Sequence, residues 1–294
     1  MRRRQFWAAL AAWLTVGVAT AVVTVSVVTH VSTRTTARTA GPGAARPTTG
    51  AGQGADSPPG SVTAAASWIA RQVSPSAVVA CDPEMCAALR AAGLLQARLL
   101  VLRVSATDTL GADIIVATPV VRSQFGTRLA SVYAPEVIAS FGSGPSQIEV
   151  RYAPPDGAQS YYVTLTADRG ARVAAGWELV HNQHVHASGP ARGALIAGRV
   201  DPRLLVVLAA LAAQQQVSVT AFGDVSPGAA DVPLRGAMIG AGPLALMQAT
   251  RSFLLSQRPP YLPAQTRLIQ ESNGQYLLVL QFDAPSPLGL SGGL

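Results

Sequence analysis

The sequence predicts an α/β protein that follows an N-terminal transmembrane helix and a disordered stalk. An apolar run comes directly after a basic N-terminus, and a stretch rich in Thr, Ala, Gly and Pro follows it. From there on, short apolar runs alternate with helix-like segments. We therefore divide the chain into a cytoplasmic basic end (1–5), a transmembrane helix (6–29), a disordered linker (30–63), an α/β domain (64–155) and an α+β domain (156–294).

The N-terminal segment is expected to be a signal anchor that holds the chain in the cell membrane by a single span. Residues 2–4 are arginines, and no further charged residue occurs until Arg34. At about 1.5 Å per helical residue, the apolar run is long enough to cross a hydrocarbon core of ~30 Å. Arginines before the span favour a cytoplasmic N-terminus and an extracytoplasmic C-terminal domain. A cleaved signal peptide ending at Ala19-Thr20-Ala21 is the alternative, and it exports the same domain.

Residues 30–63 show no apolar periodicity and are dominated by small and polar residue types. Such a segment cannot bury enough apolar surface to offset the entropy lost on ordering. We therefore expect a disordered linker between the membrane and the folded part.

The formal net charge of +7 belongs largely to the N-terminal region. From residue 64 onward, 16 arginines face 14 acidic residues, so the predicted domains are nearly neutral. Binding to a phosphate backbone needs a strongly basic surface. We expect no nucleic-acid partner.

The α/β domain is expected to alternate helices with buried strands. The helix at 83–93 has the clearest signals, because Asp82 can cap it, Pro83 occupies its first position and Gly93 can end it. Strands separated by helices, with continuous apolar character, favour a mostly parallel sheet. The predicted helices are 64–73, 83–93, 119–126 and 134–142, and the predicted strands are 76–81, 97–104, 112–118 and 147–153.

The run Gly142-Ser143-Gly144-Pro145 invites comparison with a phosphate-binding loop. Such a loop follows a strand and precedes a helix, so that the helix N-terminus faces the anion. Here a predicted helix comes first and a strand follows. We therefore expect a helix C-cap followed by a turn, with the glycines in left-handed conformation.

The α+β domain is expected to contain a buried helix at 201–213, a strand at 216–224 and a helix at 243–257. Asp201 and Pro202 supply the cap and the first position of the buried helix. Residues 266–282 predict a β-hairpin that turns at Asn273-Gly274.

Three histidines, His181, His184 and His186, stand close together in the α+β domain. Imidazole is a common metal ligand, but these three do not share one face of a helix or of a strand. No glutamate accompanies them in the pattern of a metallohydrolase helix. We expect a solvated, partly strand-like segment and no metal site.

The two cysteines, Cys81 and Cys86, are expected to form a structural disulfide. Cys81 ends a predicted strand and Cys86 lies one turn into the next helix, in a domain placed where conditions are oxidising. Redox pairs have two intervening residues instead of four, and a zinc site needs two further ligands. Free buried thiols are the alternative.

Asp82, Glu84 and Arg122 are the candidate ligand-binding residues. Asp82 would stand at the carboxyl end of a parallel strand, where open α/β sheets usually bind ligands. Glu84 lies two residues further, and Arg122 follows the strand 112–118 at the same edge. This trio could hold a sugar or a small anion. Alternatively, Asp82 caps its helix, Glu84 complements the helix dipole and Arg122 is a solvated side chain.

The segments SWIARQV, AVVACD, DIIVATPVVR and SFGSGPSQIEVR, within residues 64–152, carry a family resemblance. This region resembles the soluble extracytoplasmic C-terminal region of bacterial membrane glycosyltransferases that use polyprenyl-phosphate sugars. The resemblance implies an α/β accessory domain near envelope glycan synthesis. In that family, catalysis resides in a multi-span membrane part that this chain lacks, so no catalytic residue is carried over.

The sequence favours a membrane-anchored, non-catalytic extracytoplasmic module that binds an envelope component or a membrane-protein partner. No nucleophile-elbow motif stands between a predicted strand and a predicted helix, since the run GLSGG at 289–293 lies in a Pro/Gly-rich tail with no helix to follow it. No metalloprotease motif or phosphate-binding loop occurs in the sequence, and we expect no cofactor. An enzyme acting on cell-wall glycan or on a lipid-linked sugar is one alternative. A structural subunit of an envelope assembly is the other.

Overall fold

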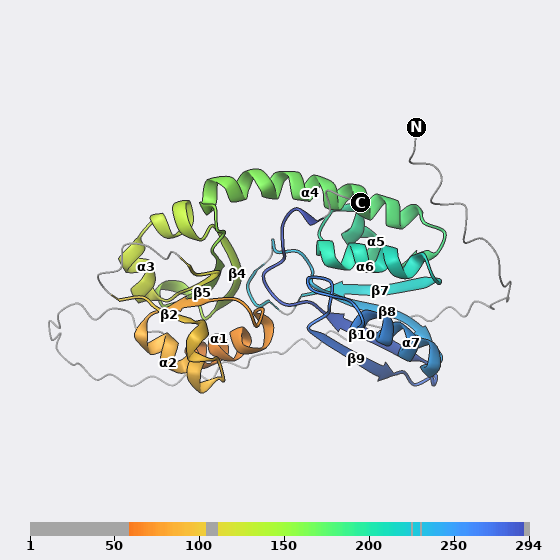
Figure 1. Ribbon diagram of the computed structural model, residues 1–294, viewed down its shortest axis with the longest axis horizontal. Coiled ribbons are helices and arrows are strands. Elements are labelled where there is room, and N and C mark those ends of the chain that lie inside the picture. The colour runs from red at the N-terminus through yellow and green to blue at the C-terminus, as the bar shows by residue number, and fades with distance from the viewer. Residues whose placement is uncertain (1–58, 104–110, 225, 230, 291–294) are drawn as a thin grey trace, which may run out of the picture. The chain divides into compact units, whose positions relative to one another are not determined.

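The computed structural model describes residues 59–103, 111–224, 226–229 and 231–290 (Figure 1). All of them belong to one compact unit that runs from Gly50 to Leu294. The predicted transmembrane helix 6–29, and the predicted linker up to residue 58, lie outside the described residues. Within the described part of the chain, every helix is too short or too polar to cross a membrane.

The first half of the described chain forms a five-stranded sheet in the order β2-β1-β3-β5-β4. β1 pairs in parallel with β2 and β3, whereas β5 runs antiparallel to β3 and β4. The sheet is therefore mixed, with two parallel and two antiparallel pairs, and the expectation of a mostly parallel sheet is wrong for half of it. Its elements are α1 (Pro59–Gln72), β1 (Val79–Cys81), α2 (Pro83–Ala91), η1 (Gln96–Arg98), β2 (Leu99–Val101), β3 (Ile114–Ala117), α3 (Pro119–Phe125), η2 (Leu129–Tyr133), β4 (Glu136–Phe141), η3 (Gly144–Ser146) and β5 (Ile148–Tyr152).

Local signals placed several of these elements correctly. α2 begins at Pro83 with its Asp82 cap, as predicted, and α3 begins at Pro119, the predicted first residue, where Thr118 caps it. α1 begins at Pro59, five residues earlier than predicted, so the last residues of the predicted linker are helical.

The largest error concerns residues 134–142, which were predicted as a helix and instead form β4. Pro135 and Gly142 resemble helix boundary signals, but the segment is short and contains the β-branched pair Val137-Ile138. Pairing with β5, in which Phe141 lies opposite Ile148, satisfies its backbone groups instead. Because β4 is a strand, the hairpin that it forms with β5 accounts for the antiparallel part of the sheet.

The loop Gly142–Pro145 therefore joins two strands and does not end a helix. The predicted turn is confirmed, and the predicted helix C-cap is wrong. Gly142 has φ +76° and Gly144 has φ +65°, both in the left-handed region that favours glycine. A Cβ at Gly142 would also lie 2.9 Å from Ser61 Oγ of α1, so this corner needs glycine for two reasons.

The second half forms another five-stranded sheet, in the order β6-β7-β8-β10-β9. β6 and β7 are parallel and the remaining pairs are antiparallel. The predicted buried helix 201–213, strand 216–224, helix 243–257 and hairpin 266–282 correspond to α6, β7, α7 and β9–β10, whereas α4, α5 and β8 were missed. The elements are α4 (Gly157–His181), β6 (Val185–Ala187), α5 (Gly189–Ile196), α6 (Pro202–Ala212), β7 (Val217–Gly223), β8 (Gly236–Gly242), α7 (Leu244–Leu255), β9 (Gln265–Gln270) and β10 (Tyr276–Gln281).

The two sheets share a strand–helix–hairpin unit. In the first, β3 is followed by α3 and by the hairpin β4–β5, and β5 returns to pair with β3. In the second, β8 is followed by α7 and by the hairpin β9–β10, and β10 returns to pair with β8. The remaining two strands are arranged differently, since β1 is internal in the first sheet and β7 in the second. The likeness lies in topology, and no sequence repeat accompanies it.

The chain after β10 returns to the first half. Ala284 forms a parallel bridge with Val73, and Ser74 N donates to Ala284 O at 2.9 Å. Ala284 is 1% exposed and packs into the core that α1 and α2 form against the first sheet. The C-terminal segment therefore connects the two halves through both backbone pairing and apolar packing.

Candidate functional site

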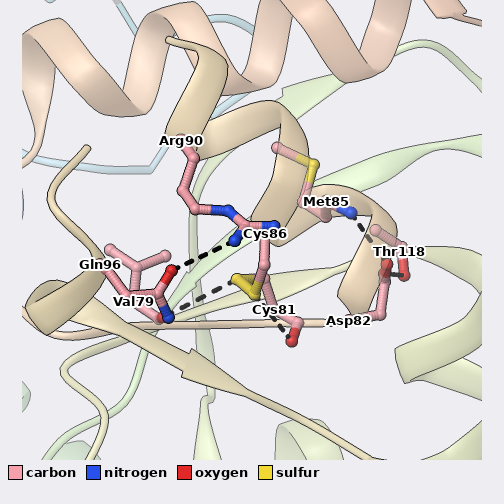
Figure 2. The surroundings of a disulfide bond; sticks show 8 residues. All are labelled: Val79, Cys81, Asp82, Met85, Cys86, Arg90, Gln96 and Thr118. Carbon is pink, nitrogen blue, oxygen red and sulfur yellow. Dashed lines mark hydrogen bonds between the residues drawn. A yellow bond between two sulfur atoms is a disulfide. The ribbon is translucent and has the colours of Figure 1, made fainter. Parts of the chain in front are cut away.

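The carboxyl ends of β1 and β3 meet as predicted, and Asp82 lies between them (Figure 2). Asp82 Oδ1 accepts from Met85 N at 3.0 Å, and its Oδ2 accepts from Thr118 Oγ1 at 2.5 Å. Thr118 Oγ1 in turn caps α3 by accepting from Val121 N. Asp82 is 6% exposed, so both of its oxygens serve the two helix starts instead of facing a solvent-filled site.

The structure does not bring the other two candidate residues into contact with Asp82. Glu84 is exposed in the first turn of α2, where it complements the helix dipole. Arg122 donates through Nη2 to Pro145 O at 2.6 Å and lies 4.0 Å from Glu149 Oε1. Arg122 thus belongs with Glu149 on β5, whose other oxygen pairs with Arg151 Nε at 2.7 Å.

The predicted disulfide between Cys81 and Cys86 is confirmed (Figure 2). It joins the last residue of β1 to the first turn of α2, and both cysteines are almost fully buried in the first core. Asp82 stands between them in the sequence. The disulfide and the Asp82 cap therefore fix the same strand–helix corner.

The three histidines lie on different elements. His181 ends α4, where its Nδ1 lies 2.8 Å from Trp177 O and its ring stacks on the Trp177 indole at 5.3 Å. His184 lies in the following loop, and His186 is an exposed residue of β6. Among the residues that the structure describes, no group of three or more His, Cys, Asp or Glu side chains could hold a metal ion.

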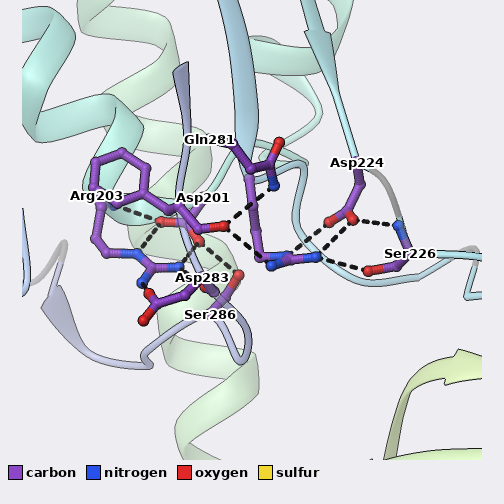
Figure 3. A network of polar contacts seen from close by, with 9 residues as sticks. Asp201, Arg203, Asp224, Ser226, Gln281, Asp283 and Ser286 are labelled. Atoms are coloured by element: carbon purple, nitrogen blue, oxygen red, sulfur yellow. Dashed lines mark hydrogen bonds and ion pairs between the residues drawn. The ribbon is translucent and has the colours of Figure 1, made fainter. Parts of the chain in front are cut away.

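A buried cluster of charges lies near the C-terminal segment, and sequence reasoning missed it (Figure 3). The Asp201 carboxylate, fully buried, receives Arg203 Nε at 3.0 Å and Arg203 Nη2 at 2.8 Å. Arg203 Nη1 reaches Asp283 Oδ1 at 2.9 Å, and Ser286 Oγ donates to Asp201 Oδ2 at 2.6 Å. This cluster ties the start of α6 to the C-terminal segment.

A second buried arginine, Arg235, connects the segment before β8 with the end of β7. Its Nε and Nη2 form a fork on Asp224 at 3.0 and 2.9 Å, and Nη2 also donates to Ser226 Oγ (Figure 3). Its Nη1 donates to Phe282 O at 3.1 Å. The loop that follows β7 reaches the first half, where Ser140 N of β4 donates to Pro227 O at 2.7 Å.

Two polar side chains, Glu136 of β4 and Tyr161 of α4, lie near each other. The Tyr161 hydroxyl is buried and lies near the Glu136 carboxyl without the geometry of a hydrogen bond to any described residue. Burial raises the pKa of Glu136, and burial together with the nearby Glu136 charge raises the pKa of Tyr161. The hollow beside Glu136 has a volume of only about 10 Å³, which is too small for a ligand.

A larger hollow, here called the proline groove, lies between the two halves. It has a volume of about 780 Å³ and is lined by residues from 70–76, from 259–265 and from the C-terminal segment 283–287, together with Arg98 and Arg203. Its volume falls in the range of about 300–1,000 Å³ that is typical of ligand pockets, which often lie where two substructures meet. Six prolines line it: Pro75, Pro259, Pro260, Pro263, Pro285 and Pro287.

Comparison with known proteins adds no assignment. A scan against protein-family models and searches of curated proteins and of solved structures find no match to this chain.

Proposed function

We propose that the protein is a membrane-anchored, extracytoplasmic, non-catalytic module whose proline groove binds an envelope component or a membrane-protein partner. The groove carries this proposal, because it combines a ligand-sized volume with walls from both halves of the compact unit. A ligand held there would contact residues from both halves at once.

Two observations support an extracytoplasmic location for the folded part. The predicted anchor at 6–29 and the arginines before it place the following domain outside the cytoplasm. The Cys81–Cys86 disulfide is consistent with this placement, since disulfides persist in oxidising compartments. The link to envelope glycan synthesis rests on the resemblance of residues 64–152 to the glycosyltransferase C-terminal region.

The proposal of a non-catalytic module rests on the structural roles of the acidic side chains. Asp82, the best acid candidate in the sequence, uses both oxygens to organise two helices. The buried carboxylates Asp201 and Asp224 each pair with an arginine of the fold. These arrangements stabilise the fold, and they do not leave the acids poised for proton transfer.

Site-specific photo-crosslinking in intact membranes tests the proposal. A photoreactive residue replaces Leu262, which lines the groove and is 39% exposed, and in a matched variant it replaces Leu246, which is 42% exposed on α7. We expect a discrete glycan or membrane-protein adduct at position 262 only. Adducts of equal pattern and yield at both positions, or none at 262, would contradict binding in the groove.

A further inference from the structure

Arg98 is a partly buried arginine that has no carboxylate partner among the described residues. Its Nε donates to Ala77 O at 3.0 Å and its Nη2 to Ser74 O at 2.6 Å. The structure describes no ion pair for Arg98, and no bond to its Nη1. Burial lowers the pKa of Arg98, as expected for a charge that has lost water without gaining an anion. Five N–H groups are present, so the guanidinium keeps donors for a further acceptor.

The other buried arginine of the groove shows the contrast. Arg203 lines the groove as well, but Asp201 and Asp283 both pair with it. That cluster therefore carries one excess negative charge. Arg71, which also lines the groove, donates to Ser67 Oγ at 2.6 Å and has no ion pair among the described residues. Arg71 and Arg98 together leave the groove with one net positive charge.

The remaining walls suit a sugar ring. The prolines present rigid apolar surfaces that lose little conformational entropy when a ligand binds. Ser74, Ser76 and Gln265 also line the groove and offer hydroxyl and amide groups. Ligand sites commonly combine mostly apolar walls with a few polar groups that fix orientation.

We propose that the proline groove binds an anionic sugar, with its carboxylate or phosphate held by Arg98. The proposal rests on the proposed function and names the chemistry of the envelope component. A planar guanidinium already fixed by two carbonyls can offer the oxyanion two parallel N–H donors. Arg71 adds attraction from the rim, and the sugar ring lies on the prolines.

The test is calorimetric titration of the full-length protein in detergent at low salt. The probes are glucuronate, glucose 1-phosphate, inorganic phosphate and neutral glucose. We expect glucuronate or glucose 1-phosphate to bind at least about tenfold more tightly than glucose, because charge-assisted hydrogen bonds are roughly twice as strong as neutral ones. The tighter of the two identifies the anion as carboxylate or phosphate. Equal binding of glucose would overturn the role of Arg98, and equal binding of inorganic phosphate would overturn recognition of the sugar.

Two variants separate binding from folding. Arg98→Gln removes the charge but also disturbs the turn at Ser74–Ala77. Ser76→Asp changes neither the Ser74 nor the Ala77 carbonyl that Arg98 contacts, and it adds a carboxylate to the same turn, where we expect it to compete with the ligand. Both are expected to weaken binding at least about tenfold, whereas Arg169→Gln, an exposed arginine on α4, should leave it unchanged. Unchanged binding in the folded Ser76→Asp protein would refute the proposal.

Failure of anionic-sugar binding can be distinguished from failure of the groove as a binding site. If no anionic probe binds while the adduct at position 262 persists in the Ser76→Asp background, the groove binds a partner by other means. If both the probes and the adduct are absent, the groove is not a binding site.

Discussion

Asp201→Asn is expected to destabilise the protein through Arg203. The Asp201 carboxylate accepts Arg203 N, Nε and Nη2 at 2.8, 3.0 and 2.8 Å, and Ser286 Oγ at 2.6 Å. Asn keeps the helix cap, but it removes the negative charge and offers an amide group where the guanidinium needs an acceptor. The Arg203 side chain is only 4% exposed, so water cannot replace the lost partner.

The expected loss of unfolding free energy follows from the burial of the Asp201–Arg203 ion pair. Removing one partner of a buried ion pair costs about 3–5 kcal/mol, because an uncompensated charge remains. Asp283 still contacts Arg203 Nη1 at 2.9 Å, and Asn retains the cap, which places the expected loss near ~3 kcal/mol. For a folded part of this size, that corresponds to a fall in Tm of about 6–12 °C.

Urea and thermal unfolding followed by circular dichroism measure the effect. Asp283→Asn is the matched control, because its side chain is 23% exposed and should cost no more than about 1 kcal/mol. Adding Arg203→Met to Asp201→Asn removes the stranded charge, so the double variant should lose less than the sum of the two single losses. A loss for Asp201→Asn that equals the loss for Asp283→Asn would refute the reasoning from burial.

Three further predictions concern other parts of the fold. Replacing Cys81 and Cys86 with alanine should cost about 2 kcal/mol, the loop-closure value for so short a loop, which urea unfolding with and without reductant can check. Gly142→Ala should cost at least about 1 kcal/mol, as measured by Tm, because the left-handed φ and the contact with Ser61 Oγ both oppose a Cβ; an unchanged Tm would contradict this. The raised pKa of Glu136 means that the native state binds the extra proton, so stability contributed by this group falls as pH rises from 4.5 through the raised pKa. The Glu136→Gln variant should lack that fall, which urea unfolding at a series of pH values can measure. Parallel stability–pH curves for the two proteins would contradict a contribution from Glu136.

Local chemistry made part of the fold predictable. Asp82-Pro83, Thr118-Pro119 and Asp201-Pro202 each place a capping oxygen beside a proline, and each begins a helix. Asn273-Gly274 lies in the loop of a real hairpin, with Gly274 at φ +80°. These signals act over a few residues, so no knowledge of distant segments was needed.

The wrong or missing predictions concern features that depend on contacts between segments far apart in the sequence. Residues 134–142 became a strand because β5 offered a partner. α4 escaped notice because its buried positions, although spaced as one helix face, include the charged residues Asp168 and Arg172, so no continuous apolar stripe marks the helix. The candidate edge at Asp82 could be located from the sequence, but its partner Thr118 lies 36 residues away. The Arg203–Asp283 pair spans 80 residues, and the walls of the proline groove come from five separate parts of the chain, so neither leaves a local pattern in the sequence.

The return of the C-terminal segment to the first half affects how the chain can mature. Ribosomes release the first half first, yet Ala284, which packs in the first core and bridges Val73, follows the whole of the second half in the sequence. The first half therefore stays incomplete, with part of its apolar surface uncovered, until the segment around residue 284 has been synthesised and, if the domain is exported, has crossed the membrane. Such a protein depends on protection of the growing chain until then, and a stop codon that removes residue 284 would damage the half that was made first.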